Sequence, residues 1–297
     1  MHFRTGILDN RPRTRGYNRT MPAVHAMRLS QQLLPTVSSE LAAELQTYDW
    51  QCARVIERGK DHTVLVAEDL AVARIPRRSD PNLDRTMRLL EDLRLPWQVP
   101  TPLSVVDGGV IQRYIPGTAH PHGSGDVAAL AEIVAAFDAY DVTDLDLNVP
   151  FAQRGRFTRT MLSALDTVVP DHMAWDIAEY VHGWTDDRLG AGLVHGDLAG
   201  HNMHWVDGEL IGILDWDYAA VWDTALNATY LSLWHGVALE DITPVPNRAK
   251  VWSGALGLYS LADALTWDVS PAGWRRLLKK VKPRILAAHR NLHAAED

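Results

Sequence analysis

Residues 193–217 contain the polar side chains whose types and spacing most directly suggest chemistry. Asp197 follows His195 by two positions, Asn202 follows Asp197 by five, and Asp215 lies thirteen positions after Asn202. A carboxylate can orient an attacking hydroxyl or accept its proton. An amide oxygen and a second carboxylate are hard ligands that suit Mg²⁺. The pattern predicts phosphoryl transfer, with Asp197 aligning a hydroxyl while Asn202 and Asp215 hold magnesium against the phosphates of a nucleotide.

The residues between Asn202 and Asp215 predict a β-hairpin. Met203–Val206 and Glu209–Leu214 have the pattern of two short strands, and the Asp-Gly pair between them is a strong turn signal. Because a hairpin reverses the chain, we expect Asp215 to return beside Asn202.

His-Gly-Asp-Leu, then Asn, then Asp-Trp-Asp, resembles the aminoglycoside phosphotransferase and choline kinase-like family of small-molecule kinases, with Gly196 where protein kinases carry Arg. The resemblance extends from about Trp50 to Tyr230. It implies a protein kinase-like α+β fold in two lobes. The N-lobe would be a small antiparallel sheet with one main helix, and the C-lobe would be mainly helical. The implied cofactors are ATP or GTP and Mg²⁺. The implied partner is a small-molecule acceptor with a free hydroxyl, such as an aminoglycoside- or macrolide-like antibiotic.

The resemblance also assigns nucleotide-binding residues before position 80. Arg58–Leu65, which contains Gly59, stands where the family places its loop over the phosphates. Arg74 stands where protein kinases carry a phosphate-binding Lys, and its run Arg-Ile-Pro-Arg-Arg is similar to macrolide phosphotransferases. A guanidinium can hold phosphate oxygens bidentately, so we expect Arg74 to keep the phosphate-binding role.

Two further nucleotide-side features follow from the same resemblance. The helical partner of Arg74 is predicted to be Asp84, since a short Asp opposite a long Arg spans the distance of a Lys–Glu pair, and Glu91 is the alternative. Backbone groups at Gln112–Tyr114 are expected to bind the purine edge.

The residues after Asp215 supply candidates for acceptor binding. Asp217 is expected to contact the substrate or a second metal shell, and Trp222 and Asp223 are the other predicted substrate contacts. The family often carries a second carboxylate where this chain has Asn227, which leaves the acceptor open.

Three alternatives remain at this point. His195, Asp197, His201 and His204 could instead bind zinc, since a His/Asp cluster within ten residues can do so. A metabolite kinase acting on an amino alcohol, amino acid or sugar fits the same motifs. A nucleotide-binding pseudokinase without turnover is the third, motivated by Arg74 and by the departure at Asn227.

Composition limits the class of protein. The 297 residues are 46% hydrophobic, which allows a sizeable core, and no apolar run approaches a membrane span. A single cysteine excludes an internal disulfide framework, so we expect a cytoplasmic protein. We also expect a monomer or homodimer that does not bind a membrane. Residues 1–26, rich in Arg and without apolar periodicity, are expected to form a disordered tail, with Met21 and Met27 as alternative starts. The N-lobe is predicted over residues 27–115 and the C-lobe over 116–297.

Charge is divided unevenly along the chain. Residues 1–115 hold 16 Lys and Arg against 13 Asp and Glu (+3), and residues 116–297 hold 13 against 24 (−11). The acidic half disfavours nucleic acid and predicts a cationic acceptor. The carboxylates proposed to draw it are Asp138, Asp141, Asp144, Asp146, Asp186, Asp187, Asp217 and Asp223.

Local patterns predict where the secondary structure lies. Five strands of an N-terminal sheet are predicted at Gln51–Glu57, Thr63–Glu68, Leu70–Ile75, Leu103–Val106 and Val110–Tyr114, with a helix at Asn82–Leu95. After a hinge at Ile115-Pro116-Gly117, helices are predicted at Val127–Ala139, Thr158–Val168, Ala174–Thr185, Ala225–Trp234, Ala249–Leu265 and Ala272–His289.

Overall fold

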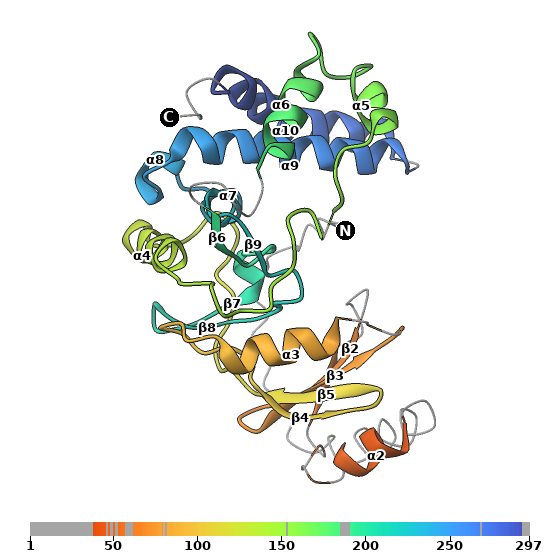
Figure 1. Cartoon of the computed structure of the whole chain (residues 1–297), viewed down its shortest axis with the longest axis vertical. Coiled ribbons are helices and arrows are strands. Elements are labelled where there is room, and N and C mark those ends of the chain that lie inside the picture. The colour runs from red at the N-terminus through yellow and green to blue at the C-terminus, as the bar shows by residue number, and fades with distance from the viewer. Residues whose placement is uncertain are drawn as a thin grey trace, which may run out of the picture.

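The structure, a computed structural model, describes residues 38–45, 47, 50, 53–56, 62–78, 80, 82–152, 154–184, 191–267 and 269–292. A twisted antiparallel sheet with two helices forms one end of the molecule, and a mainly helical region forms the other (Figure 1). This confirms the predicted α+β architecture. The predicted tail at residues 1–26 and Gly59 of the predicted phosphate loop lie outside the described residues, whereas residues 62–65 of that loop belong to a strand that begins at His62.

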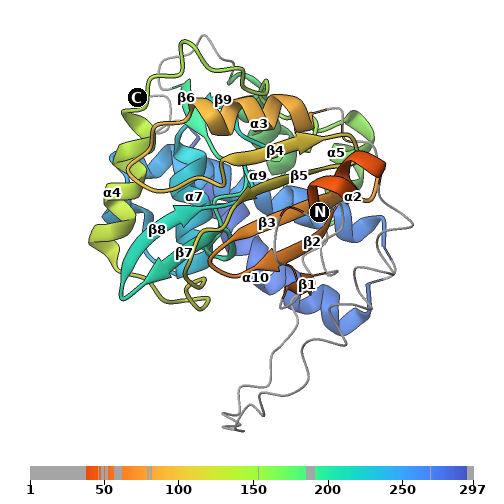
Figure 2. The same cartoon turned by 90° about the horizontal axis from the view of Figure 1, so that it is seen from below.

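The N-terminal sheet has the predicted five strands, all antiparallel, in the order β1-β2-β3-β5-β4 (Figure 2). Their ends differ from the predicted ends by a few residues. The strands are β1 (Arg54–Ile56), β2 (His62–Ala67), β3 (Ala71–Pro76), β4 (Pro102–Val106) and β5 (Gly109–Arg113).

The two faces of this sheet bury different side chains because successive residues of a strand point to opposite faces. Val110 of β5 joins the main core, together with Leu90 of helix α3 (Leu83–Asp92). Ile111, the next residue, belongs to a smaller cluster with Leu65 and Ala73 on the other face. Helix α2 (Ser39–Leu45) packs near β4, and the Ser38 hydroxyl caps it by accepting from the backbone of Leu41 (3.1 Å).

The C-terminal region is built around a long helix, α9, which contacts α5, α6, α7, α8 and α10. Most of its small and aliphatic residues are buried, and a proline opens its first turn, where a missing N–H costs nothing. The helices are α4 (Val127–Asp138), α5 (Arg159–Leu165), α6 (Met173–His182), α7 (Ala225–His235), α8 (Leu239–Ile242), α9 (Pro246–Leu265) and α10 (Pro271–Arg290). No described helix is both long and apolar enough to cross a bilayer.

Two small antiparallel sheets lie between the N-terminal sheet and the helices. The predicted hairpin is present as β7 (Met203–Val206) and β8 (Glu209–Ile213), and this confirms the turn between them. The second sheet pairs β6 (Ala191–Val194) with β9 (Ala220–Asp223) and was not predicted, because neither four-residue strand shows a two-residue alternation.

The β7–β8 hairpin is tied to both ends of the β4–β5 segment. Gln98 donates to the Ile211 carbonyl (2.9 Å) and accepts from the Ile213 backbone (3.0 Å) before β4. Thr118 exchanges two backbone bonds with Trp205 after β5 (3.1 and 3.0 Å). The residues that follow this hairpin are therefore held directly against the base of the N-terminal sheet.

Candidate active site

The loop after β6 places Asp197 in the interior, where 1% of the residue is exposed. His195 fixes the loop from within. Its Nδ1 accepts from the Asp197 backbone (3.2 Å), and its Nε2 therefore carries the proton and donates to the Leu214 carbonyl (2.9 Å). Burial lowers the pKa of His195 to about 4, so the ring is neutral at pH 7. The imidazole thus joins the Asp197 loop to the segment that carries Asp215.

Two glycines of this loop lie where a side chain would not fit. Gly196 has a φ of +84°, and a Cβ there would lie 2.4 Å from the Tyr218 carbonyl oxygen. A Cβ on Gly200 would lie 2.2 Å from the Trp234 indole nitrogen. The close approach at Gly196 explains why this position does not carry the Arg that protein kinases have.

Asn202 is the last residue of a single 3₁₀ turn, η2 (Gly200–Asn202), and its side chain is buried against Asp197. Its Nδ2 donates to the Asp197 carbonyl (2.9 Å) and lies 3.5 Å from Asp197 Oδ2. Its own carbonyl accepts from the Leu214 backbone (2.7 Å), so the residue before Asp215 is bonded to Asn202. The hairpin therefore returns the chain to Asn202, and the amide oxygen stays available as a ligand.

The carboxylate of Asp197 keeps one oxygen without a partner. Its Oδ1 is buried and makes no hydrogen bond within the described residues, while Oδ2 lies 3.7 Å from His201 Nε2. A buried acceptor without a donor is costly, so this oxygen is suited to receive an incoming hydroxyl.

The Asp-Trp-Asp run splits between the core and the site. Trp216 is 1% exposed, donates to the Ile213 carbonyl (2.9 Å) and stacks on Phe137 with ring centroids 6.0 Å apart. Asp215 on one side of it has a φ of +63°. With the tryptophan anchored inward, Asp215 and Asp217 both face Arg74.

Arg74 lies on β3 and forms ion pairs with both carboxylates. Its Nη2 lies 2.6 Å from Asp217 Oδ2 and 3.6 Å from Asp215 Oδ1, and its Nη1 lies 3.4 Å from Asp217 Oδ1. The prediction that Asp84 or Glu91 pairs with Arg74 is not met. Both acids are exposed on α3, and neither forms an ion pair with Arg74 among the described residues.

The charges of this cluster shift one another's pKa. Burial opposes ionisation of Asp217, but the charge and hydrogen bonds of Arg74 outweigh it and lower the pKa of that carboxyl. Partial burial and the neighbouring charge of Asp217 raise the pKa of Asp215. Of these two carboxylates, Asp215 is the one whose negative charge the protein compensates less.

The predicted purine-binding segment needs one correction. Gln112 lies inside β5, between partners Val72 of β3 and Pro102 of β4, and its side chain is buried and donates to Met87 Sδ (3.6 Å). Its backbone is thus within the sheet rather than at a hinge. Tyr114 is the first residue after the strand and is half-buried.

Asp223 is a structural residue rather than the predicted substrate contact. Its carboxylate is fully buried, lies 3.0 Å from Arg248 Nε, and accepts from the indole of Trp252 and the backbone of Ala225 (3.0 Å). Trp222, beside it, packs edge-on against Phe151 and Trp252 with centroids 4.6 and 5.0 Å apart. Its ring thus contributes to a core cluster, and an acceptor contact by Trp222 stays a prediction.

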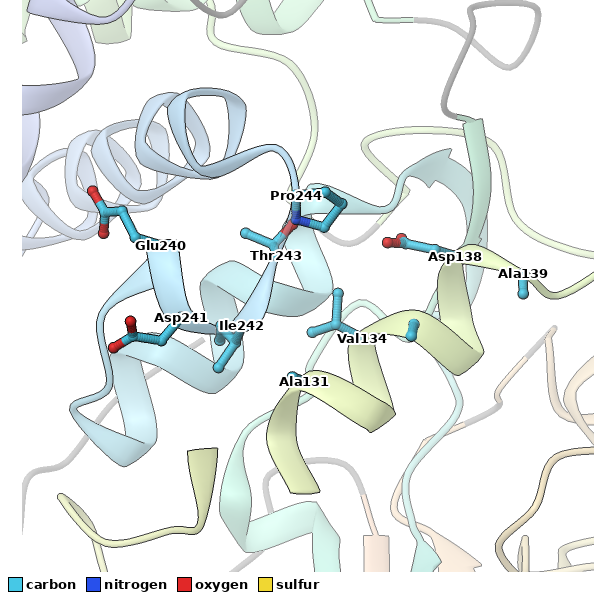
Figure 3. A pocket seen from close by; sticks show the side chains of 10 residues that line it. Ala131, Val134, Asp138, Ala139, Glu240, Asp241, Ile242, Thr243 and Pro244 are labelled. Atoms are coloured by element: carbon cyan, nitrogen blue, oxygen red, sulfur yellow. The ribbon is translucent and has the colours of Figure 1, made fainter. Parts of the chain in front are cut away.

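The described members of the predicted acidic set do not form one surface. Asp217 is paired with Arg74, and Asp146 pairs on the surface with Arg88 at 3.6 Å. Asp138 lines a groove of about 540 Å³ between α4 and α8, with Glu240 and Asp241 on the facing helix (Figure 3). That groove holds none of the residues of the Asp197 site. The described carboxylates therefore do not gather around the Asp197 site, and a cationic acceptor stays a prediction.

Two of the three histidines of the zinc alternative bond to the backbone, and the third, His201, lies 3.7 Å from Asp197. Both nitrogens of His195 bond to the backbone, and His204 Nδ1 donates to the Ile115 carbonyl (2.9 Å). In the part of the chain that the structure describes, no three His, Cys, Asp or Glu residues are grouped to hold a metal ion. The geometry favours the oxygen pair of Asn202 and Asp215 over an imidazole site.

The solved structures to which this chain is similar include phosphotransferases and a choline/ethanolamine kinase family protein. The macrolide 2'-phosphotransferase MphH from Brachybacterium faecium is 22% identical, with a TM-score of 0.55 over 82% of this chain and 97% of that chain. A choline/ethanolamine kinase family protein from Mesorhizobium loti is 18% identical, with a TM-score of 0.57 over 86% and 98%. The aminoglycoside phosphotransferase APH(2'')-Ib, solved with ADP bound, is 14% identical, with a TM-score of 0.54 over 86% and 99%. These likenesses define the kinase-like class of fold.

The chain belongs to the phosphotransferase enzyme family, whose sequence profile matches residues 52–260. The resemblance drawn from the Asp197 and Asp215 motifs is thereby confirmed. No curated protein sequence matches the chain.

Proposed function

We propose that this protein transfers the γ-phosphate of ATP or GTP to a hydroxyl of a small molecule. The observation that carries the proposal is the convergence of Asp197, Asn202 and Asp215, with the guanidinium of Arg74 3.6 Å from Asp215. Phosphoryl transfer is catalysed mainly by positioning and by neutralising phosphate charge, and these four groups supply both.

Each residue has a separate task in this proposal. The free Oδ1 of Asp197 accepts a hydrogen bond from the acceptor hydroxyl and orients it, and it takes up the proton as the new bond forms. Asn202 holds Asp197 through its Nδ2. Arg74 contacts phosphate oxygens, and backbone groups near Tyr114 face the purine.

Mg²⁺ fits the oxygen ligands at this site. Asn202 offers an amide oxygen, and the carboxylate of Asp215 is 42% exposed and faces a cation, the guanidinium of Arg74. Magnesium bound by these two residues would neutralise charge on the nucleotide phosphates.

The proposed acceptors are macrolide- or aminoglycoside-like compounds. The likeness of the fold to a macrolide phosphotransferase and an aminoglycoside phosphotransferase supports this class. A metabolite kinase acting on an amino alcohol, amino acid or sugar is the second candidate, and the likeness to a choline/ethanolamine kinase family protein favours it.

A panel assay distinguishes these functions. Purified protein is incubated with Mg²⁺ and either ATP or GTP, together with aminoglycosides, macrolides, amino alcohols and sugars, and phosphorylated products are identified by mass spectrometry. We expect one acceptor class to be phosphorylated, and no product when Mg²⁺ is chelated. Nucleotide binding with no phosphorylated product from any hydroxyl compound would support the non-catalytic alternative instead.

A further inference from the structure

Arg74 crosses from the N-terminal sheet to the segment that follows β8. Two of its nitrogens face the two oxygens of Asp217, Nη2 to Oδ2 at 2.6 Å and Nη1 to Oδ1 at 3.4 Å. The Arg74 side chain is 11% exposed and that of Asp217 is 21% exposed. Because the pair is largely shielded from water and has the parallel geometry of a guanidinium–carboxylate fork, it is stronger than an ordinary surface ion pair.

The fork fixes a side chain that would otherwise be variable. An arginine has four rotatable bonds, and ordering it costs about 2 kcal/mol of conformational entropy. Asp217 restrains that freedom before any ligand arrives, and His62 Nδ1 lies 3.4 Å from the same Nη2. A guanidinium has five N–H donors, so donors remain for phosphate oxygens after the fork has formed.

Helix α3 provides no such restraint in the described part of the chain. Asp84 and Glu91 are exposed, and Arg88 of that helix pairs with Asp146 rather than with an α3 acid. The carboxylate that faces Arg74 therefore comes from the far side of the site, across the boundary between the sheet and the helices.

We propose that Asp217 is the positioning residue for Arg74, taking the role that was expected of a carboxylate on α3. The pair holds the guanidinium beside Asp215, ready for nucleotide phosphates, and links the N-terminal sheet to the Asp-Trp-Asp segment. This inference rests on the proposed function, because the guanidinium is positioned for a nucleotide. It makes Asp217 part of the nucleotide side of the site instead of the acceptor side.

A double-mutant cycle on nucleotide affinity tests the pairing. The dissociation constant of a fluorescent ATP analogue is measured, with Mg²⁺ and with EDTA, for the wild type, Asp217→Asn, Arg74→Met and the double variant. We expect each single change to weaken binding by about tenfold or more, and the double variant to bind within about twofold of Arg74→Met, since the second change removes a restraint on a group already lost. Asp84→Asn and Glu91→Gln serve as controls and should stay within about twofold of the wild type.

Several outcomes would overturn the inference. If Asp217→Asn binds the nucleotide analogue as the wild type does, Asp217 acts on the acceptor instead of on Arg74. If the two single effects multiply in the double variant, Asp217 acts independently of Arg74, for example through magnesium. If Asp217→Asn does not fold, Asp217→Glu replaces it, and its loss of affinity should disappear in the Arg74→Met background.

The same titrations separate the inference from the proposed function. If the wild type and Asp217→Asn bind nucleotide with equal affinity, only the positioning role is contradicted. A wild type that binds neither ATP nor GTP contradicts the proposed function and the positioning role together.

Discussion

Asn227 of helix α7 holds the backbone on both sides of Val194. Its Oδ1 accepts from the His195 N–H (3.1 Å), and its Nδ2 donates to the Leu193 carbonyl (2.8 Å). The residue is fully buried. An amide can serve one donor and one acceptor at once, which a carboxylate cannot do. The departure from the acidic residue of the family therefore has a structural function, since it joins α7 to the loop that carries Asp197.

Replacing Asn227 should destabilise the protein and misplace that loop. Asn227→Ala leaves a buried N–H and a buried carbonyl without partners, and we expect a loss of about 2 kcal/mol or more in the free energy of unfolding. Chemical denaturation measures it. Asn82→Ala is the control, because the exposed Asn82 makes no side-chain cap at α3 and should change stability by less than about 0.5 kcal/mol. Equal stability of the two variants would contradict the role of Asn227.

Asp223 should behave as a stability residue in experiments. Asp223→Ala leaves Arg248, whose side chain is 17% exposed, without its carboxylate, and breaking such a buried pair costs about 3 kcal/mol. Thermal unfolding should show the loss, while Asp241→Asn on the surface of α8 should not. If Asp223→Ala kept its stability and only raised the acceptor KM, the substrate assignment would be restored.

Stability should fall in acid because His195 is buried in its neutral form. Its pKa is 6.5 in an unfolded chain and about 4 in the folded protein, so between these values the unfolded state binds more protons. The stabilisation that follows from the low pKa of His195 is fully present above pH 6.5. It decreases as the pH falls towards 4, by on the order of 3 kcal/mol in total. Unfolding curves recorded at several pH values give the free energy of unfolding, which should depend less steeply on pH for His195→Gln than for the wild type. Asn82→Ala replaces an exposed side chain that carries no charge and should keep the wild-type slope, and three identical slopes would contradict the assignment.

Magnesium-dependent nucleotide binding should require Asp215. Asp215→Ala removes the carboxylate that we assign to the metal, and the nucleotide affinity gained on adding Mg²⁺ should disappear. His204→Ala should keep that gain, although loss of the bond to Ile115 should lower stability by about 1 kcal/mol. Isothermal titration with and without Mg²⁺ measures both variants. Loss of the metal response in His204→Ala alone would point to an imidazole metal site.

Local sequence patterns predicted most of the strands and helices, because each pattern depends only on residues that are close together in the chain. The turn between β7 and β8 and the helical spacing of α3 are properties of short segments. The β6–β9 pairing joins residues about thirty positions apart, and no local pattern encodes it.

The partner of Arg74 could not be predicted from counting along the chain. Its carboxylate lies 143 positions away, and the choice between α3 and the Asp-Trp-Asp segment depends on how two distant parts pack. Asp223 was misassigned for a related reason, since sequence alone does not show that Arg248 and Trp252 of α9 surround it. The anchoring role of Asn227 could have been suspected because this amide stands between the apolar residues Leu226 and Ala228 in the first turn of α7.

The most direct test of the proposed phosphoryl transfer is the turnover of Asp197→Ala with saturating nucleotide, Mg²⁺ and the best acceptor of the panel. We expect turnover to fall on the order of 10²-fold or more while the nucleotide dissociation constant stays within about threefold of the wild type, because Asp197 orients the hydroxyl and does not hold the nucleotide. His201→Ala, which changes the neighbour 3.7 Å away, should retain most of the activity. Turnover of Asp197→Ala close to that of the wild type would contradict the assignment of this carboxylate as the residue that activates the acceptor.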